Sequence, residues 1–178
     1  MKIDNNIKNK IINKATQIGF QKIGFAEAKF YKDDQEKLDS WLDNNYHATM
    51  EWINKRKEER SNILKYFPEV KTVMSFGFNY FSGRGSDTLS DEFKFSNYAW
   101  GDDYHIVIKK RLHKILDEIK QNDDSIDGLV CVDTSPVTEK VWAQRAGIGW
   151  IGKHTNLITR EYSSWLFLGV IIINLLEK

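Results

Sequence analysis

The stretch from Leu129 to Lys153 reads LVCVDTSPVTEKVWAQRAGIGWIGK, and its pattern decides the fold class of the chain. An apolar run over residues 129–132 predicts a short buried strand that ends at the carboxylate of Asp133. Pro136 suits the first turn of a helix over residues 136–146, with Ser135 as its cap. Three glycines and a lysine follow before the next strand. A strand, a helix and another strand in succession indicate a sheet covered by helices.

The rest of the chain also alternates between helical and strand patterns. Apolar residues at helical spacing, together with one charged segment, predict helices over residues 3–18, 38–46, 51–60 and 108–119. Further strands are expected over residues 22–26, 70–80, 156–159 and 165–175. Residues 82–97 have the composition of a long loop. The sequence therefore predicts an α/β or α+β fold, with one domain over residues 1–178 and a central mixed sheet flanked by helices.

The composition is that of a globular protein of the reducing cytoplasm. Hydrophobic and charged fractions of 41% and 29% in 178 residues are sufficient for one core. The formal net charge of +1 gives no overall attraction to nucleic acid or to a membrane surface. The single cysteine, Cys131, excludes an internal disulfide and a cysteine-built metal site, and we expect it in the core.

No segment of the sequence has the pattern of a secretion signal or a membrane span. The N-terminus lacks the apolar segment of a signal peptide. The longest apolar run, Trp165 to Leu176, is shorter than the roughly 20 residues that a membrane-spanning helix needs. We interpret this run as a buried strand, and we expect a cytoplasmic location and no membrane partner.

Asp133 is the first candidate for chemistry, because it is predicted to lie where a strand ends and a helix begins. Such positions line the ligand crevice of open α/β sheets. A carboxyl group that is partly desolvated there has a raised pKa and can act as a general acid near neutral pH. Capping of the following helix is a common role for an aspartate in this position, and the spacing alone favours it. Both interpretations stay open.

The glycines of this stretch spell G-x-G-x-x-G, yet their order excludes a dinucleotide-binding fingerprint. That fingerprint requires a strand, the glycines and then a helix, whereas here the helix comes first. Gly147 is well explained as the C-cap of the helix. Gly149 and Gly152 either let backbone amides approach a large ligand or allow tight turns. Lys153 either meets an anionic ligand or is solvated.

The segment from Tyr98 to His105 opens the predicted helix over residues 108–119. Its aspartates, Asp102 and Asp103, are expected to cap the helix and to interact with its dipole. The four histidines of the chain have no spacing typical of metal ligands, so we expect no zinc site.

Taken together, several segments resemble the epoxyqueuosine reductases, a family of cobalamin-dependent enzymes of queuosine synthesis. The segments that carry this resemblance are Phe67 to Tyr80 (FPEVKTVMSFGFNY), Tyr98 to His105 (YAWGDDYH), Val132 to Pro136 (VDTSP), Arg145 to Lys153 (RAGIGWIGK) and Ser164 to Gly169 (SWLFLG). They occur in consistent order over almost the whole chain.

The resemblance implies a nitroreductase-like cobalamin-binding architecture and the reduction of epoxyqueuosine to queuosine in the anticodon stem-loop of tRNA. It also implies that Asp133 protonates the oxygen released when the epoxide opens, which is chemically reasonable because an unprotonated alkoxide is a poor leaving group. The cofactor-binding positions implied in this way are Arg60, Tyr104, His105, Asp133, Gly149, Gly152, Lys153, Leu157 and Leu168. None of these residues is expected to ligate a metal.

Family members also carry a ferredoxin-like module with two 4Fe–4S clusters and C-terminal helical repeats, neither of which is found in residues 1–178. One cysteine cannot ligate a cluster. We therefore expect a truncated or split form that is incomplete on its own, with a separate iron–sulfur polypeptide as a candidate partner. Two other functions stay open: a non-catalytic corrinoid-binding module, and a nitroreductase-like reductase that uses flavin or nicotinamide.

Overall fold

The computed structural model describes residues 2–3, 5–83, 95–121 and 125–177. At its centre is a four-stranded sheet in the order β2 (Lys22–Glu27), β3 (Thr72–Asn79), β7 (Leu166–Ile173) and β4 (Gly128–Cys131). All three pairings in this sheet are antiparallel. The two-residue strands β1 (Lys2–Ile3) and β8 (Leu176–Glu177) pair in parallel. The predicted α+β class, with a central sheet flanked by helices, is confirmed, but the central sheet is antiparallel and not mixed as predicted.

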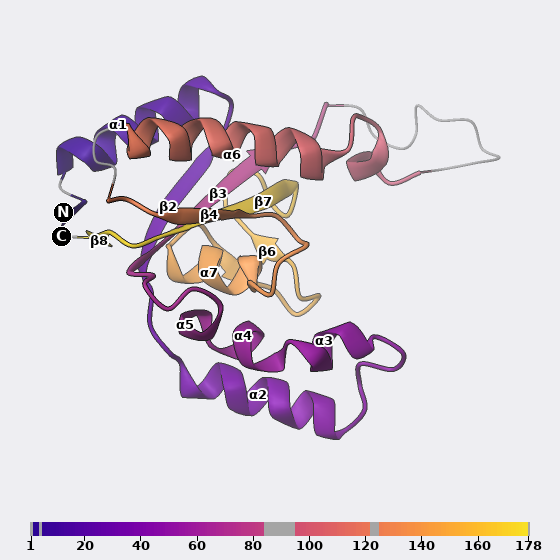
Figure 1. Cartoon of the computed structure of the whole chain (residues 1–178). Helices are drawn as coiled ribbons and strands as arrows, with labels where there is room; N and C mark the ends of the chain where they lie inside the picture. The colour runs from indigo at the N-terminus through magenta and orange to yellow at the C-terminus, as the bar shows by residue number, and fades with distance from the viewer. Residues whose placement is uncertain (1, 4, 84–94, 122–124, 178) are drawn as a thin grey trace.

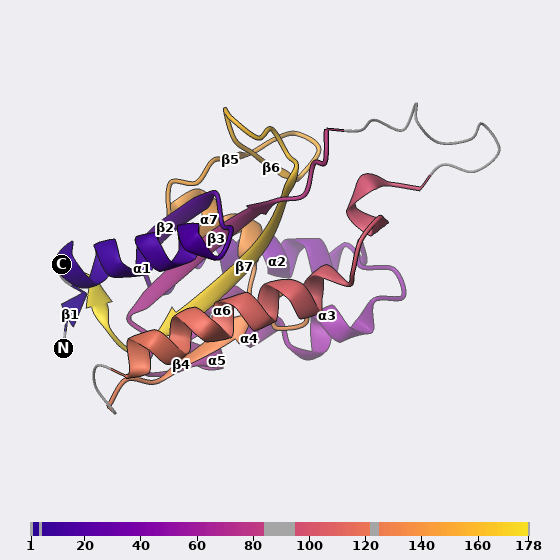
Figure 2. The same ribbon diagram turned by 90° about the horizontal axis from the view of Figure 1, so that it is seen from above.

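The sheet is covered by helices on both faces (Figure 1). One face carries α1 (Asn5–Gln17) and α6 (Tyr104–Lys120), which lie across the strands in the view from above (Figure 2). The other face carries α7 (Glu139–Arg145) and the hairpin of β5 (Trp150–Ile151) and β6 (Leu157–Ile158). A further layer beyond α7 consists of α2 (Lys32–Asp43), α3 (Glu51–Lys55), α4 (Lys57–Ser61) and α5 (Ile63–Tyr66). A short 3-10 helix, η2 (Asn97–Ala99), precedes α6.

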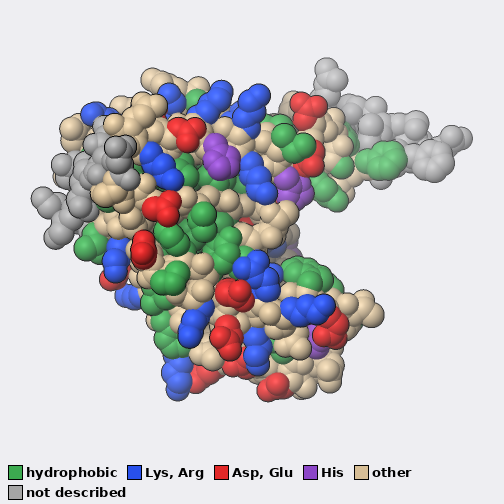
Figure 3. All heavy atoms as spheres, in the orientation of Figure 1, with side chains coloured by type: hydrophobic (Ala, Val, Ile, Leu, Met, Phe, Trp, Pro, Cys, Tyr) green, Lys and Arg blue, Asp and Glu red, His purple; other side chains and the backbone are tan. Residues whose placement is uncertain are grey.

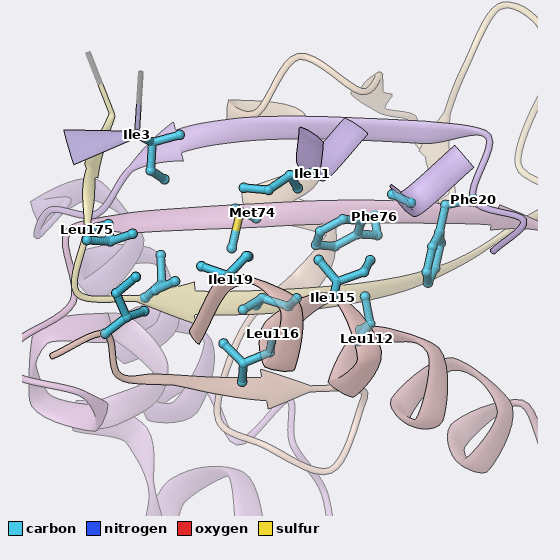
Figure 4. Packing of buried hydrophobic residues seen from close by; sticks show 14 of the residues in the cluster. Ile3, Ile11, Phe20, Met74, Phe76, Leu112, Ile115, Leu116, Ile119 and Leu175 are labelled. Atoms are coloured by element: carbon cyan, nitrogen blue, oxygen red, sulfur yellow. The ribbon is translucent and has the colours of Figure 1, made fainter. Parts of the chain in front are cut away.

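Side chains on alternate positions of β3 and β7 enter two different cores. Met74 and Phe76 of β3 pack with Ile171 and Ile173 of β7 against α1 and α6 (Figure 4). The intervening residues, including Val73, Val170 and Ile172, pack on the opposite side with Trp142 of α7. Because both faces are covered, a strand can be apolar at every position. This arrangement confirms the interpretation of the long apolar run near the C-terminus as a buried strand.

The helix predicted over residues 136–146 begins later than expected. It starts at Glu139 with Thr138 at the N-cap position, so the prediction that Ser135 caps it and Pro136 opens it is wrong. The physical reason is a bend over residues 132–136, in which the chain turns around Asp133 before it can become helical.

The charged segment over residues 51–60 forms two short helices and not one. Arg56, with φ of −125°, separates α3 from α4. The prediction over residues 38–46 extends too far, since α2 ends at Asp43 and Asn45 takes a φ of +57°. Within the loop predicted over residues 82–97, residues 84–94 lie outside the described part of the chain. Among the described helices, none is long and apolar enough to cross a membrane.

Candidate functional site

Asp133 follows β4 and has a backbone conformation that is uncommon for a residue with a side chain. Its φ is +52°. The N–H of Thr134 donates to the carbonyl of Val132 at 2.6 Å, which closes a three-residue turn around Asp133. A non-glycine residue in this region costs about 1 kcal/mol or more, and it persists where surrounding contacts hold it. The carboxyl group is 48% exposed, so it is accessible to a ligand.

Tyr104 and His105, the first two residues of α6, hold the Asp133 carboxylate. The Tyr104 hydroxyl donates to Oδ2 of Asp133, and Nε2 of His105 lies 3.3 Å from the same oxygen. The Tyr104 ring is stacked between Phe167, with 4.1 Å between ring centroids, and His105, with 4.0 Å. Burial raises the pKa of Tyr104, and its hydrogen bond to Asp133 adds to this effect. The Tyr104 hydroxyl therefore remains protonated and remains a hydrogen-bond donor to Asp133.

Asp103 orients the His105 ring. It is the N-cap of α6, and its Oδ1 accepts from the His105 backbone N–H at 2.9 Å, as the sequence predicts for an aspartate at this position. The same oxygen lies 2.7 Å from Nδ1 of His105, and the hydrogen bonds from His105 lower the pKa of Asp103. With Nδ1 engaged in this way, Nε2 is the ring nitrogen that faces Asp133.

Glu139 lies against the Asp133 turn from the other side, within electrostatic range of Arg60 of α4. Its Oε1 accepts from the backbone N–H of Asp133 at 2.9 Å. Burial raises the pKa of Glu139 to about 7, and the positive charge of Arg60 opposes this rise. Burial lowers the pKa of Arg60, whose Nε has no hydrogen-bond partner among the described residues. Figure 3 shows the surface hollowed between the layer of α6 and the layer of α2 to α5.

These contacts exclude one of the two interpretations of Asp133, and its role as a general acid stays a prediction. Helix capping is wrong, because Thr138 occupies the N-cap of α7 and the Asp133 carboxylate points to α6. Lys109, one turn along α6, donates to the Thr134 hydroxyl at 3.0 Å and further ties the turn to that helix. Cys131, in contrast, is 1% exposed, which confirms its predicted place in the core.

The glycines that follow α7 are explained by the chain's own packing. Gly147 has a φ of +75°, its N–H donates to Gln144 and the N–H of Ile148 donates to Ala143, which together form a Schellman motif. The predicted C-cap role of Gly147 is confirmed. A Cβ atom on Gly149 would lie 2.1 Å from the carbonyl oxygen of Ile158 in β6. Close approach to β6, which is neither of the two reasons considered from the sequence, is thus sufficient to explain the absence of a side chain at Gly149.

The remaining predicted cofactor residues gather around the β5–β6 hairpin. Leu157 is buried and forms a small apolar cluster with Ala143 and Ile148, against which the partly buried Leu168 packs. Gly152 lies in the turn of the hairpin, where a Cβ atom would lie 2.6 Å from the Ile158 side chain. Lys153, in the same turn, is exposed.

The two groups of predicted residues meet at β7. Phe167 touches Tyr104 on one face of the sheet, and the next residue, Leu168, joins the Leu157 cluster on the other. A cavity of about 450 Å³ opens beside Tyr104. Its lining residues include Phe78, Tyr80, Phe81, Trp100, Tyr104 and Phe167. Tyr104 belongs both to the lining of this cavity, which is rich in aromatic residues, and to the contacts that hold Asp133, which is not itself a lining residue.

Sequence reasoning missed Glu139, Phe167 and Lys109. A glutamate in the first turn of a helix is common, and an aromatic residue in an apolar strand is expected in the core, so neither attracts notice. Only contacts between distant segments distinguish them. Within the part of the chain that the structure describes, no group of three His, Cys, Asp or Glu side chains could hold a metal ion.

Comparisons with known proteins connect this geometry to a family. The family model described as epoxyqueuosine reductase QueG, DUF1730, matches residues 60–134, from Arg60 to just past Asp133. An epoxyqueuosine reductase from Atelocyanobacterium thalassa is 40% identical over 172 residues, which are 96% of this chain and 55% of that relative.

Two solved structures agree in fold. A structure of epoxyqueuosine reductase with an epoxyqueuosine-modified tRNA stem loop matches 97% of this chain, with 26% identity and a TM-score of 0.83. A structure of epoxyqueuosine reductase from Bacillus subtilis, named for an aspartate catalytic loop that is swung out of the active site, matches 96% with 25% identity and a TM-score of 0.81. The chain spans about half the length of these proteins.

Proposed function

We propose that this chain, which is homologous to the epoxyqueuosine reductases along nearly its whole length, forms the catalytic part of an oxidoreductase that converts epoxyqueuosine in tRNA to queuosine. The observation that carries the proposal is the accessible Asp133 carboxyl group, held on a turn with positive φ by Tyr104 and His105. A structural relative is named for an aspartate catalytic loop. The Asp133 carboxyl group does not cap a helix and is accessible at the surface.

The reaction needs a proton donor at the position of Asp133. Removing an epoxide oxygen as water consumes two electrons and two protons, and the oxygen leaves readily only if it is protonated as the carbon–oxygen bond breaks. In this proposal Asp133 donates that proton. Tyr104 holds one carboxyl oxygen of Asp133, so the other can turn to the substrate. Nε2 of His105, 3.3 Å from the held oxygen, is placed to return a proton afterwards.

Cobalamin is the cofactor we propose, and the residues of the site fit it. When bound, cobalamin supplies the metal centre that reacts with the substrate carbon. The buried Nε of Arg60, which has no partner among the described residues, is a donor for the amide groups around a corrin. Leu168 presents a partly exposed apolar surface, and the buried Leu157 supports it. Tyr104, His105, Gly149, Gly152 and Lys153 are the other contacts that we propose.

The electrons must come from outside this chain. Its one cysteine is buried in the core, whereas an iron–sulfur cluster is typically held by four cysteine thiolates. We propose that an iron–sulfur protein or module supplies them, either as a further part of the reductase or as a separate polypeptide.

The substrate that we propose is the anticodon stem-loop of tRNA, because a structural relative was solved with an epoxyqueuosine-modified stem loop. The net charge of +1 means that this chain alone offers little general attraction for a polyanion. Much of the phosphate contact therefore belongs to the rest of the reductase. A tRNA substrate places the reaction in the cytoplasm.

Binding of cob(II)alamin tests the proposal. We expect the protein to change the visible spectrum of cob(II)alamin and to retain it during gel filtration. Arg60→Gln should weaken retention at least several-fold, whereas Arg56→Gln, at an exposed position of the same segment, should not. No spectral change and no retention would contradict both the reductase and the non-catalytic corrinoid module. If cobalamin binds, a chemical reductant and epoxyqueuosine-containing tRNA distinguish the enzyme from a carrier.

A further inference from the structure

Glu139 is a partly buried carboxyl group for which the proposed reaction gives no role. It is the first residue of α7, and its side chain points back along the chain to the turn that precedes the helix. There its Oε1 accepts the backbone N–H of Asp133 at 2.9 Å. Charged side chains are rarely desolvated without a specific partner, so this contact calls for an explanation.

The Asp133 turn requires such a partner. Its φ of +52° is unfavourable for a residue with a Cβ atom, and the N–H of Thr134 is already used within the turn. The Asp133 N–H is the remaining donor of the turn, and Glu139 accepts it. The side chain of Asp133 is held by Tyr104 and His105 from the opposite direction. Backbone and carboxyl group are thus fixed by different elements, α7 and α6.

The charged groups around Glu139 come from each element packed against it. Asp133 follows β4, Arg60 belongs to α4, and the electrostatic influence of Glu139 also reaches Tyr104 of α6 and Cys131 of β4. Among the groups with a resolved effect on Glu139, Arg60 is the positive one and Asp133 the negative one. Arg60 therefore favours the ionised form of Glu139, and Asp133 opposes it.

We propose that Glu139 is a positioning residue, whose carboxylate holds the Asp133 N–H and so keeps the Asp133 carboxyl group against Tyr104 and His105. The inference rests on the proposed function only for the role of Asp133 as the acid. A carboxylate is a stronger acceptor than a carboxylic acid, so the hold tightens as Glu139 loses its proton. Because the pKa of Glu139 is raised to about 7, this change falls near neutral pH.

The backbone amide of Asp133 reports the contact directly, without cofactor or substrate. In the ¹⁵N–¹H NMR spectrum of the wild-type chain, the Asp133 amide should shift with pH, with a midpoint near 7. Glu139→Gln keeps an oxygen acceptor but has no titratable charge. The pH-dependent shift of the Asp133 amide that is due to Glu139 should therefore be absent in this variant. His105 is also close to Asp133 and is present in both proteins. Only the difference between wild type and Glu139→Gln therefore measures the effect of Glu139.

A second variant tests the strength of the hold. Glu139→Ala should speed hydrogen exchange of the Asp133 amide about tenfold or more, since a hydrogen bond to a charged group is lost. Glu161→Gln is the matched control, because Glu161 is an exposed carboxylate paired with Lys22 on another part of the surface. An Asp133 amide with the same titration in wild type and Glu139→Gln, or unchanged exchange in a folded Glu139→Ala protein, would overturn the inference. Either result would leave cobalamin binding, and so the proposed function, to be judged separately.

Discussion

The Asp133 turn and Gly149, which leads into the β5–β6 hairpin, lie in one short stretch of sequence, and different contacts explain their backbones. Gly149 is bare because a side chain would strike the carbonyl of Ile158. In the turn, Asp133 has positive φ although it is not a glycine, and contacts from two helices hold it there. The glycine at position 149 is thus explained by packing within the chain. Asp133 is one of five described non-glycine residues with positive φ, and its contacts with Tyr104 and His105, together with its exposed carboxyl group, make it the candidate for chemistry.

The largest effect that the comparison predicts is on turnover at the Asp133 turn. Asp133→Asn should lower conversion of epoxyqueuosine by a complete reductase about 10²- to 10⁴-fold, because the proton donor is lost. Stability should change little, since asparagine also tolerates positive φ. Single-turnover conversion and urea unfolding measure the two effects. Loss of cobalamin binding in proportion to lost turnover would show that Asp133 serves the cofactor and not the proton.

The next effect concerns the stability of the hairpin. Gly149→Ala should lower the free energy of unfolding by about 3 kcal/mol, because the new methyl group meets backbone atoms that cannot move aside easily. Gly101→Ala is the control, since no heavy atom lies within 4 Å of a Cβ built there, and it should change stability by less than about 0.5 kcal/mol. If Gly149→Ala is as stable as wild type but no longer retains cobalamin, the hairpin glycine serves the ligand and the comparison fails.

Glu139 is expected to give the Asp133 turn a pH dependence. The pKa of Glu139 is raised from 4.5 to about 7 by burial, so the folded protein binds this proton more tightly than the unfolded chain. Its contribution to stability is therefore full below pH 4.5 and is lost as pH rises towards 7, by on the order of 2 kcal/mol. Urea unfolding of wild type and Glu139→Gln at about pH 5 and pH 8 measures the difference. Equal pH dependence in the two proteins would contradict the assignment to Glu139.

The smallest predicted effect sharpens the role of Tyr104. Tyr104→Phe keeps the ring stacked on Phe167 but removes the hydroxyl that holds Asp133, and should cost about 1 kcal/mol of stability. Tyr80→Phe is the control, because the Tyr80 ring also stacks on Phe167. Turnover should fall more in Tyr104→Phe than in Tyr80→Phe. Thermal unfolding and single-turnover assays of both variants test this. Equal turnover and equal stability of the two variants would show that Tyr104 contributes only by packing.

Much of the fold could be predicted because it depends on local patterns. The periodicity of α1 and α6, the strands β2, β3 and β7, and the C-cap at Gly147 all follow from neighbouring residues. The start of α7 could not be predicted in this way. Ser135 and Pro136 form a good helix start by composition, but the contacts of Asp133 with α6 and Glu139 delay the helix to Glu139.

The candidate site was predicted only in part for a similar reason. Asp133, Tyr104 and His105 were singled out by motif, and the structure brings them together. Glu139 was not, because its function lies in one backbone hydrogen bond that no spacing rule describes. Five other cofactor contacts stay predictions, which cobalamin binding will test. They are Gly149, Gly152, Lys153, Leu157 and Leu168.

The sequence by itself determined most of the helices and strands and the family that the chain resembles, since both follow from short local patterns. Tertiary structure alone decided that Tyr104 reaches Asp133 across 29 residues and that β7 lies between β3 and β4. It also decided that position 149 has no room for a side chain, because a Cβ atom there would clash with the carbonyl oxygen of Ile158. The physical reason is that these contacts join distant segments, and their geometry is set by how whole layers pack and not by any residue's neighbours in the chain.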